Sequence, residues 1–220
     1  MTGVLEQVKH LYPLADCTFT TMPGHEGGRN QIVIVSRNGE KQYVLRISAL
    51  RDRNEEQYLA ETEFVRFLAK CGAPVADVIP SVQDRLVKRL EADGKAVYVS
   101  LFAFAKGMLI ADNGYRYRKE APLGEYFWNT GKALGAIHRL AKTYVPVHSR
   151  PNYFDKYSME YLDRLIPAEY DKLKTAIAKR LDSFHTLPKD KNCYGLVHFD
   201  FSDGNYHIDM DTWPSCPAIG

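Results

Sequence analysis

The chain has 220 residues, of which 45% are hydrophobic and 25% are charged, and its formal net charge at pH 7 is +2. That length buries a substantial core, and the balanced, evenly spread charge argues against nucleic-acid and polybasic membrane partners. The most apolar run, residues 96–105, is too short to span a bilayer, and the N-terminus lacks the apolar core of a signal peptide. Four widely spaced cysteines favour reduced thiols. We therefore expect a cytoplasmic protein; the sequence carries no signal for an oligomeric state.

The first half of the chain is predicted to form an antiparallel sheet with one inserted helix. A short N-terminal helix precedes strands at 17–20, 31–36 and 41–47, and the pair Asn38-Gly39 is typical of a two-residue hairpin between the last two. Apolar residues then recur at helical spacing over 55–71, and Gly72 and Pro74 end that helix. An extended segment at 75–87 and a buried strand at 96–104 complete a predicted five-stranded sheet.

The second half is predicted to be mainly helical. A long amphipathic helix covers 123–144, one or two helices cover 155–184, and Pro167 is expected at the first position of a helix. Short strands at 194–197 and 206–209 flank a polar loop. The pattern predicts an α+β fold of two lobes, residues 1–101 and residues 102–220, with the change near 101–106.

The polar loop His198–Asn205 carries residues suited to phosphoryl transfer. That reaction needs a carboxylate for the proton of the attacking hydroxyl, oxygen ligands for magnesium, and a cation for the phosphates. Asp200 supplies the carboxylate, and Asn205, five residues later, supplies part of the metal site. A polar surface turn is the alternative, because Asp, Ser, Gly and Asn are also turn residues.

The loop resembles the catalytic loop of the aminoglycoside phosphotransferase and choline kinase-like family, the phosphotransferase enzyme family, which shares the protein-kinase fold. The family's loop reads His-Gly-Asp-x-x-x-x-Asn, and Phe199 here replaces the glycine. The resemblance implies that Asp200 is the catalytic base, that Asn205 binds magnesium, and that His198 braces the loop through hydrogen bonds.

Two earlier segments resemble the same family in the same order. Residues 43–47 resemble the strand whose Lys or Arg faces the nucleotide phosphates, which implies that role for Arg46. Residues 61–75 resemble the helix that carries the glutamate partner of that cation, which implies Glu61 rather than Glu63. Taken alone, Arg46 is an outward-facing strand residue, and both glutamates belong to a solvated helical face.

The loop 24–30 occupies the phosphate-covering position between the first two strands, although it lacks GxGxxG. The backbone amides of Gly27 and Gly28 are suited to a close approach to phosphate. His138 lies in a segment that resembles the long helix of the second lobe, where we expect a packing and hydrogen-bonding residue rather than a catalyst.

The resemblance implies an ATP-dependent, Mg2+-dependent phosphotransferase that acts on a hydroxyl of a small molecule, such as an aminoglycoside, choline or homoserine. Residues 106–120, which include Tyr117 and Arg118, are suited to an anionic or aromatic acceptor; a solvated loop is the alternative.

The end of the chain departs from the family pattern. The family carries a second metal-binding Asp on the strand that returns after the catalytic loop, but no Asp follows Asp211 here. Asp209 and Asp211 are expected in a turn, and Pro214 and Pro217 disfavour a central strand. Residues 214–220 read as the end of a truncated or frame-shifted chain, so we expect weak or absent catalysis.

Two other functions remain open. One is a non-catalytic nucleotide-binding module of the same fold. The other is a metal-dependent hydrolase, because His198-x-Asp200 and His207-x-Asp209 form two pairs of metal-binding residue types.

Overall fold

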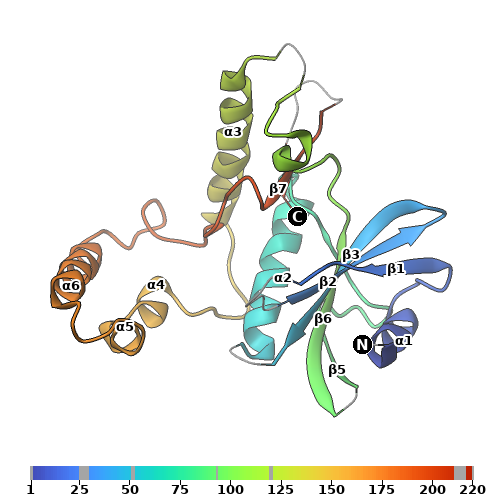
Figure 1. Ribbon diagram of the computed structural model, residues 1–220, viewed down its shortest axis with the longest axis horizontal. Helices are drawn as coiled ribbons and strands as arrows, with labels where there is room; N and C mark the ends of the chain where they lie inside the picture. The colour runs from blue at the N-terminus through green and yellow to red at the C-terminus, as the bar shows by residue number, and fades with distance from the viewer. Residues whose placement is uncertain are drawn as a thin grey trace.

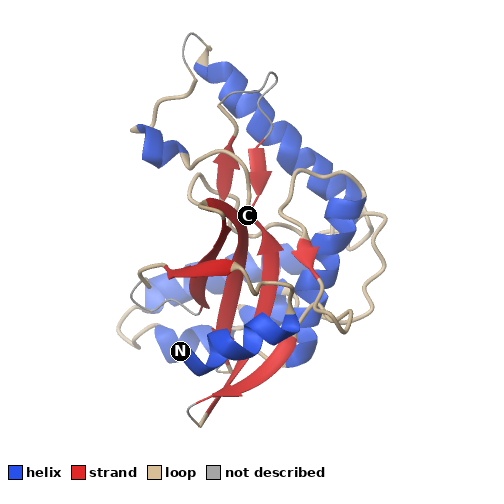
Figure 2. Cartoon of the chain, turned by 90° about the vertical axis from the view of Figure 1, so that its right-hand side faces the viewer, coloured by secondary structure: helices blue, strands red, loops and turns tan. Residues whose placement is uncertain are grey.

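The computed structural model describes residues 2–24, 30–50, 53–92, 94–118, 121–210 and 217–219. These residues form an antiparallel sheet followed by a mainly helical part, which confirms the α+β prediction. Helices α1 (Thr2–Leu11) and α2 (Glu55–Lys70) lie on opposite sides of the sheet (Figure 1, Figure 2). The strands run in the order β1 (Cys17–Thr21), β2 (Asn30–Arg37), β3 (Glu40–Ala49), β6 (Lys95–Ala103) and β4 (Val78–Ile79), and β5 (Lys88–Ala92) pairs with β6.

The described part of the sheet has six strands rather than the five predicted, because β5 was not foreseen. It forms a hairpin with β6, with Lys88 opposite Val99 and Ala92 opposite Lys95. Charged residues dominate β5, and Leu90 is the residue that it contributes to the hydrophobic core. A strand with so few apolar positions gives little periodic signal.

The Asn38-Gly39 hairpin is confirmed. Arg37 pairs with Glu40, so the loop contains two residues, and their φ angles are +53° for Asn38 and +83° for Gly39. Two successive positive φ angles define the type I′ turn, whose twist matches that of the flanking strands.

The helical part contains α3 (Leu123–Ala141), which confirms the long predicted helix, and a 3-10 turn, η1 (Ile110–Asn113). Three helices, rather than one or two, follow it, and they lie away from the sheet in Figure 1: α4 (Tyr153–Lys156), α5 (Met159–Leu165) and α6 (Asp171–His185). The prediction for Pro167 was wrong. It follows Ile166, the C-cap of α5, where proline is common because it cannot continue a helix.

The short strand predicted at 194–197 is absent from the described structure, and these residues are irregular. Tyr194 and Val197 are 42% and 55% exposed, so burial does not favour an extended segment there. The next predicted strand is confirmed as β7 (Tyr206–Ile208).

Strand β7 pairs with β8 (Pro217–Ile219) in an antiparallel two-stranded sheet. We expected the prolines to exclude a central strand at this point. Pro217 is instead the first residue of an edge strand, a position where the missing N–H group is tolerated.

Two main hydrophobic cores organise the chain. One lies between α1 and the sheet and includes Val8, Val33 and Leu101. The other joins α2, α3 and β7 through Leu68, Ile137 and Ile208 among others. The second core therefore fixes the strand that follows the loop His198–Asn205.

The segment after β6 is fastened to β7 by its backbone. Met108 and Ile208 exchange two hydrogen bonds of 3.1 and 2.8 Å, and the Tyr126 and Tyr206 hydroxyls are 2.6 Å apart. Within the described ranges, no helix has the length and apolar character needed to cross a membrane. Cys17, Cys71 and Cys193 are free thiols.

Candidate functional site

Arg46 and Glu61 meet on the α2 side of the sheet, as predicted. Leu45 and Ile47 of β3 are buried in the core beneath α1, so strand alternation turns Arg46 to the opposite face. Asn54 caps α2 by accepting a hydrogen bond from Gln57 N at 3.0 Å, and the helix carries Glu61 to the arginine. Arg46 Nη1 donates to Glu61 Oε1.

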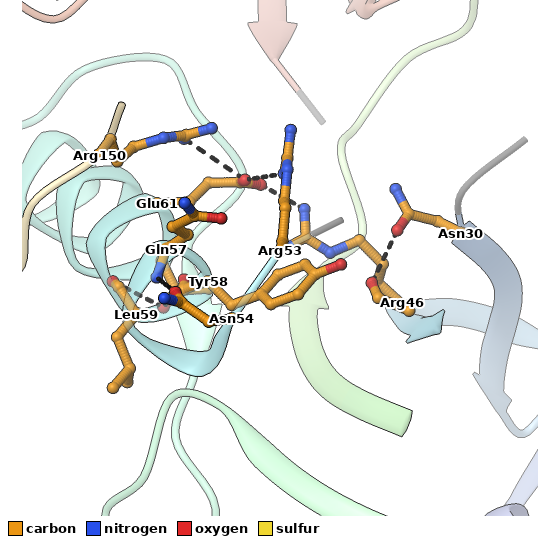
Figure 3. A network of polar contacts seen from close by, with 11 residues as sticks. Asn30, Arg46, Arg53, Asn54, Gln57, Tyr58, Leu59, Glu61 and Arg150 are labelled. Atoms are coloured by element: carbon orange, nitrogen blue, oxygen red, sulfur yellow. Dashed lines mark hydrogen bonds and ion pairs between the residues drawn. The ribbon is translucent and has the colours of Figure 1, made fainter. Parts of the chain in front are cut away.

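The Glu61 carboxylate is shared among three arginines (Figure 3). Arg46 occupies Oε1, while Arg53 Nη1 and Arg150 Nη1 contact Oε2 at 2.9 and 3.4 Å. The Arg46 and Glu61 side chains are only 14% and 20% exposed. Among the described residues of this cluster, one carboxylate faces three guanidinium groups, which leaves two positive charges in excess.

The charge cluster sets the protonation state of Glu61. Burial raises the pKa of its carboxyl, but the charge and hydrogen bond of Arg46 and the charges of Arg150 and Arg53 outweigh burial. The net pKa therefore lies below its ordinary value. Glu61 is ionised at neutral pH, and the ion pair is intact.

The guanidinium of Arg46 has a second terminal nitrogen, Nη2. Its Nη2 is buried and has no hydrogen-bond partner among the described residues. The guanidinium lies over the rings of Phe102 and Tyr58, with its central carbon 5.0 and 5.8 Å from their centroids. Buried polar groups are normally hydrogen-bonded, so this nitrogen is a candidate donor to an anionic ligand.

The loop His198–Asn205 is closed by the side chain of Asn205. Its Nδ2 donates to the Asp200 carbonyl oxygen at 2.8 Å and to Ser202 Oγ at 3.3 Å. Because the amide nitrogen serves these bonds, Oδ1 is the atom of Asn205 that suits a metal. The Asp200 side chain is 78% exposed and is accessible to a substrate.

His198 contacts the loop differently from the expected hydrogen-bonding brace. Its Nδ1 lies 3.5 Å from Asp200 Oδ1, an ion-pair contact without hydrogen-bond geometry, and this buried nitrogen has no hydrogen-bond partner in the described ranges. The ring packs edge-on against Phe201, which stacks on Tyr206 of β7. His198 thus supports the loop mainly by packing.

The predicted residues form two groups, Arg46 with Glu61 and His198 with Asp200 and Asn205. No hydrogen bond or ion pair in the described structure joins one group to the other. Gly27 and Gly28 lie outside the described residues. Sequence reasoning missed Arg53 and Arg150, because nothing in their local pattern distinguishes them from other surface arginines.

The segment 106–120 is solvated only in part. Tyr115 and Arg116 are exposed. Tyr117 and Arg118 instead bind Glu125 at the start of α3, Tyr117 through its hydroxyl at 2.9 Å and Arg118 through Nε and Nη2 at 3.0 Å each. His138 is exposed rather than packed. Glu63 binds His148 instead of Arg46, at 2.9 Å.

The hydrolase alternative needs a cluster of metal ligands. The described residues contain no group of three or more His, Cys, Asp and Glu side chains placed to hold one metal ion. His207 Nδ1 instead lies 2.9 Å from the Ala105 carbonyl oxygen.

Comparisons with known proteins bear on most of the chain. The sequence profile of the phosphotransferase enzyme family matches residues 21–216. The chain is 25% identical, over 171 residues, to an amicoumacin kinase of Bacillus subtilis (strain 168), a match that covers 76% of this chain and 48% of that protein. The chain therefore spans about half the length of that curated relative.

Two solved structures share the fold. The amicoumacin kinase hAmiN in complex with AMP-PNP, Ca2+ and Ami has a TM-score of 0.77 and 23% identity, with 94% of this chain and 60% of that one covered. A microcompartment-associated aminopropanol kinase has a TM-score of 0.74 and 14% identity, with 100% of this chain and 68% of that one covered.

Proposed function

Because the chain belongs to the phosphotransferase enzyme family, we propose that it transfers the γ-phosphoryl group of ATP to a hydroxyl of a small molecule. The observation that carries the proposal is the Arg46–Glu61 ion pair, which leaves Arg46 Nη2 buried and without a hydrogen-bond partner in the described structure. A phosphate oxygen satisfies such a nitrogen with a charge-assisted hydrogen bond.

Four residues of the two groups have a part in the proposed reaction. Arg46 holds the nucleotide phosphates, and Glu61 fixes the arginine. Asn205 binds Mg2+ through Oδ1, and the exposed Asp200 carboxylate accepts the proton of the attacking hydroxyl. Magnesium, when bound, neutralises the charge that develops on the phosphates.

The division of the chain follows the same proposal. Residues 1–101 make a nucleotide-binding lobe around the six-stranded sheet, and residues 102–220 make part of a helical lobe that carries the catalytic loop. The relatives named for amicoumacin and aminopropanol support these two compounds as the first acceptors to test, beside aminoglycosides, choline and homoserine.

A second candidate is nucleotide binding without transfer. Strand β8 consists of Pro217, Ala218 and Ile219, none of which has a side-chain oxygen to bind a metal. Within the described residues, the strand that pairs with β7 thus contains no Asp or Glu, whereas the resemblance implies a metal-binding Asp on the return strand.

One experiment separates the two. ADP release is measured with MgATP and the acceptor panel for the wild type and for Asp200→Asn, and ATP binding is measured by calorimetry. The enzyme proposal expects acceptor-dependent ADP release that falls by about 100-fold or more in Asp200→Asn. Asp203→Asn, an exposed carboxylate of the same loop, is the matched control and keeps its activity.

Binding of ATP with no ADP release for any acceptor favours the second candidate. Failure of the wild type to bind ATP overturns both.

A further inference from the structure

Between α3 and α4, three consecutive residues contact glutamates of α2: His148, Ser149 and Arg150. We call these three residues the α2 strap. His148 Nδ1 lies 2.9 Å from both carboxylate oxygens of Glu63. Ser149 contacts Glu56 Oε1 through its N–H at 3.4 Å and its hydroxyl at 3.2 Å. Together with the contact of Arg150, each strap residue is held by a different glutamate.

The geometry of α2 explains how the strap reaches Glu61. Glu56 and Glu63 are seven residues apart and share one face of the helix, whereas Glu61 lies about 140° around the helix from Glu56 at 3.6 residues per turn. With its two preceding residues fixed on the first face, the strap delivers Arg150 around the helix to Oε2 of Glu61, at 3.4 Å. Figure 3 shows Arg150 approaching Glu61 from the side opposite Arg46.

The division of the two carboxylate oxygens gives this contact a consequence for Arg46. Arg53 and Arg150 both contact Oε2, whereas Arg46 is the one described residue that binds Oε1. A carboxylate held at one oxygen cannot rotate freely, so the position of Oε1, and with it the direction of the Arg46 guanidinium, is fixed. The buried Nη2 of Arg46 is thereby held in one orientation.

We infer that Arg150 is a positioning residue for nucleotide binding: delivered by the α2 strap, it holds Glu61 so that Arg46 presents Nη2 to the phosphates. This inference rests on the proposed function. It assigns to a residue of the helical half a role in the nucleotide site formed by β3 and α2.

The test measures the dissociation constant of MgATP by calorimetry. Arg150→Ala is expected to weaken binding about three- to ten-fold, the size of coupling seen between contacting charged residues. Arg150→Lys, which keeps the charge, recovers part of the loss. Arg164→Ala is the matched control, because Arg164 forms an ion pair with Glu160 on the exposed face of α5. The MgATP affinity of the Arg164→Ala variant is expected to equal that of the wild type.

A double-mutant cycle separates positioning from direct contact with the nucleotide. If Arg150 acts through Glu61, then Arg150→Ala causes no further loss in a Glu61→Gln background. If Arg150 binds phosphate itself, the loss persists in that background and the inference is overturned.

A second variant tests the contact of the α2 strap with Glu63. Glu63→Gln weakens the anchor at His148 and is expected to reduce MgATP affinity less than Arg150→Ala, with no added effect in the double variant. Wild-type affinity in both Arg150→Ala and Glu63→Gln overturns the inference and leaves the proposed function standing. Absence of MgATP binding in the wild type overturns the proposed function and the inference with it.

Discussion

Gly107 lies against the backbone of Ile208 so closely that a Cβ on Gly107 would come within 2.2 Å of the Ile208 carbonyl oxygen and 2.5 Å of its carbonyl carbon. The φ angle of Gly107 is +83°, a conformation that other residues rarely adopt. The contact joins the segment after β6 to the strand that follows the loop His198–Asn205.

Replacing Gly107 by alanine is therefore expected to destabilise the protein by about 3 kcal/mol, because backbone atoms must move and the left-handed conformation becomes strained. Thermal unfolding followed by circular dichroism measures the effect. Gly131→Ala in α3 is the control, and the opposite effect is expected. Open space surrounds that position, so alanine should raise the free energy of unfolding by about 0.5–1 kcal/mol. An unchanged melting temperature for Gly107→Ala would contradict the close contact.

Tyr12 is 1% exposed, and its hydroxyl has no hydrogen-bond partner among the described residues. Burial raises the pKa of Tyr12 to about 12. In the unfolded chain this phenol ionises near its ordinary pKa of about 10. The free energy of unfolding is therefore unaffected by Tyr12 ionisation below pH 10. It falls by roughly 2–3 kcal/mol as the pH rises from 10 through 12.

Tyr12→Phe removes the hydroxyl that has no partner among the described residues, and with it the loss of stability at alkaline pH. At pH 7 we expect a gain of about 1 kcal/mol, because no polar group is then buried without a partner. Urea unfolding at pH 7 and between pH 9 and 11 measures both effects. Equal pH slopes for the two proteins between pH 9 and 11 would show that Tyr12 is not buried as described.

Glu61→Gln is expected to lower stability at pH 7 by about 2 kcal/mol, since three guanidinium groups lose their shared counter-charge. The folded-state pKa of Glu61 is depressed, so its contribution is present above the unfolded value of about 4.3 and is lost as the pH falls toward the folded value. The difference between wild type and variant should accordingly shrink below about pH 4 in urea titrations. A difference independent of pH from 7 to 3 would exclude the charge as its origin.

Asn205→Ala removes the side-chain bonds to the Asp200 carbonyl and to Ser202, together with the proposed metal ligand. We expect the Mg2+ concentration for half-maximal ADP release to rise at least ten-fold. Asn192→Ala, an exposed amide before the loop, serves as the control. An unchanged magnesium requirement in Asn205→Ala would limit Asn205 to closing the loop.

The sequence predicted those parts of the fold in which local pattern and tertiary packing agree. The helix 55–71 and the Asn38-Gly39 hairpin have strong local signals, and both were found within a residue or two. Strand β5 was missed because Leu90 is its one residue in the main core, and 194–197 was assigned to a strand although its apolar residues stay exposed. In both cases the local pattern did not show how much of the segment the fold buries.

The candidate site shows the same limit. Arg46 and Glu61 were predicted as partners from two ordered motifs, and the ion pair is present. Arg53 and Arg150 share that carboxylate, yet no motif marks them. The contact of Arg150 depends on how α2 packs against a segment 89 residues away. Role assignments for Asp200, Asn205 and His198 remain predictions for the experiments above.

The reach of Arg150 to Glu61 also bears on the order in which the protein is made. Translation completes β3, α2 and β6 well before residue 150 leaves the ribosome, and domains fold as units during synthesis. The nascent sheet therefore carries Glu61 with Arg46 and Arg53 alone, and the third arginine joins only after α3 has been synthesised. The Glu61 cluster would thus be completed late, so a ribosome stalled before residue 150 would carry Glu61 without its third arginine.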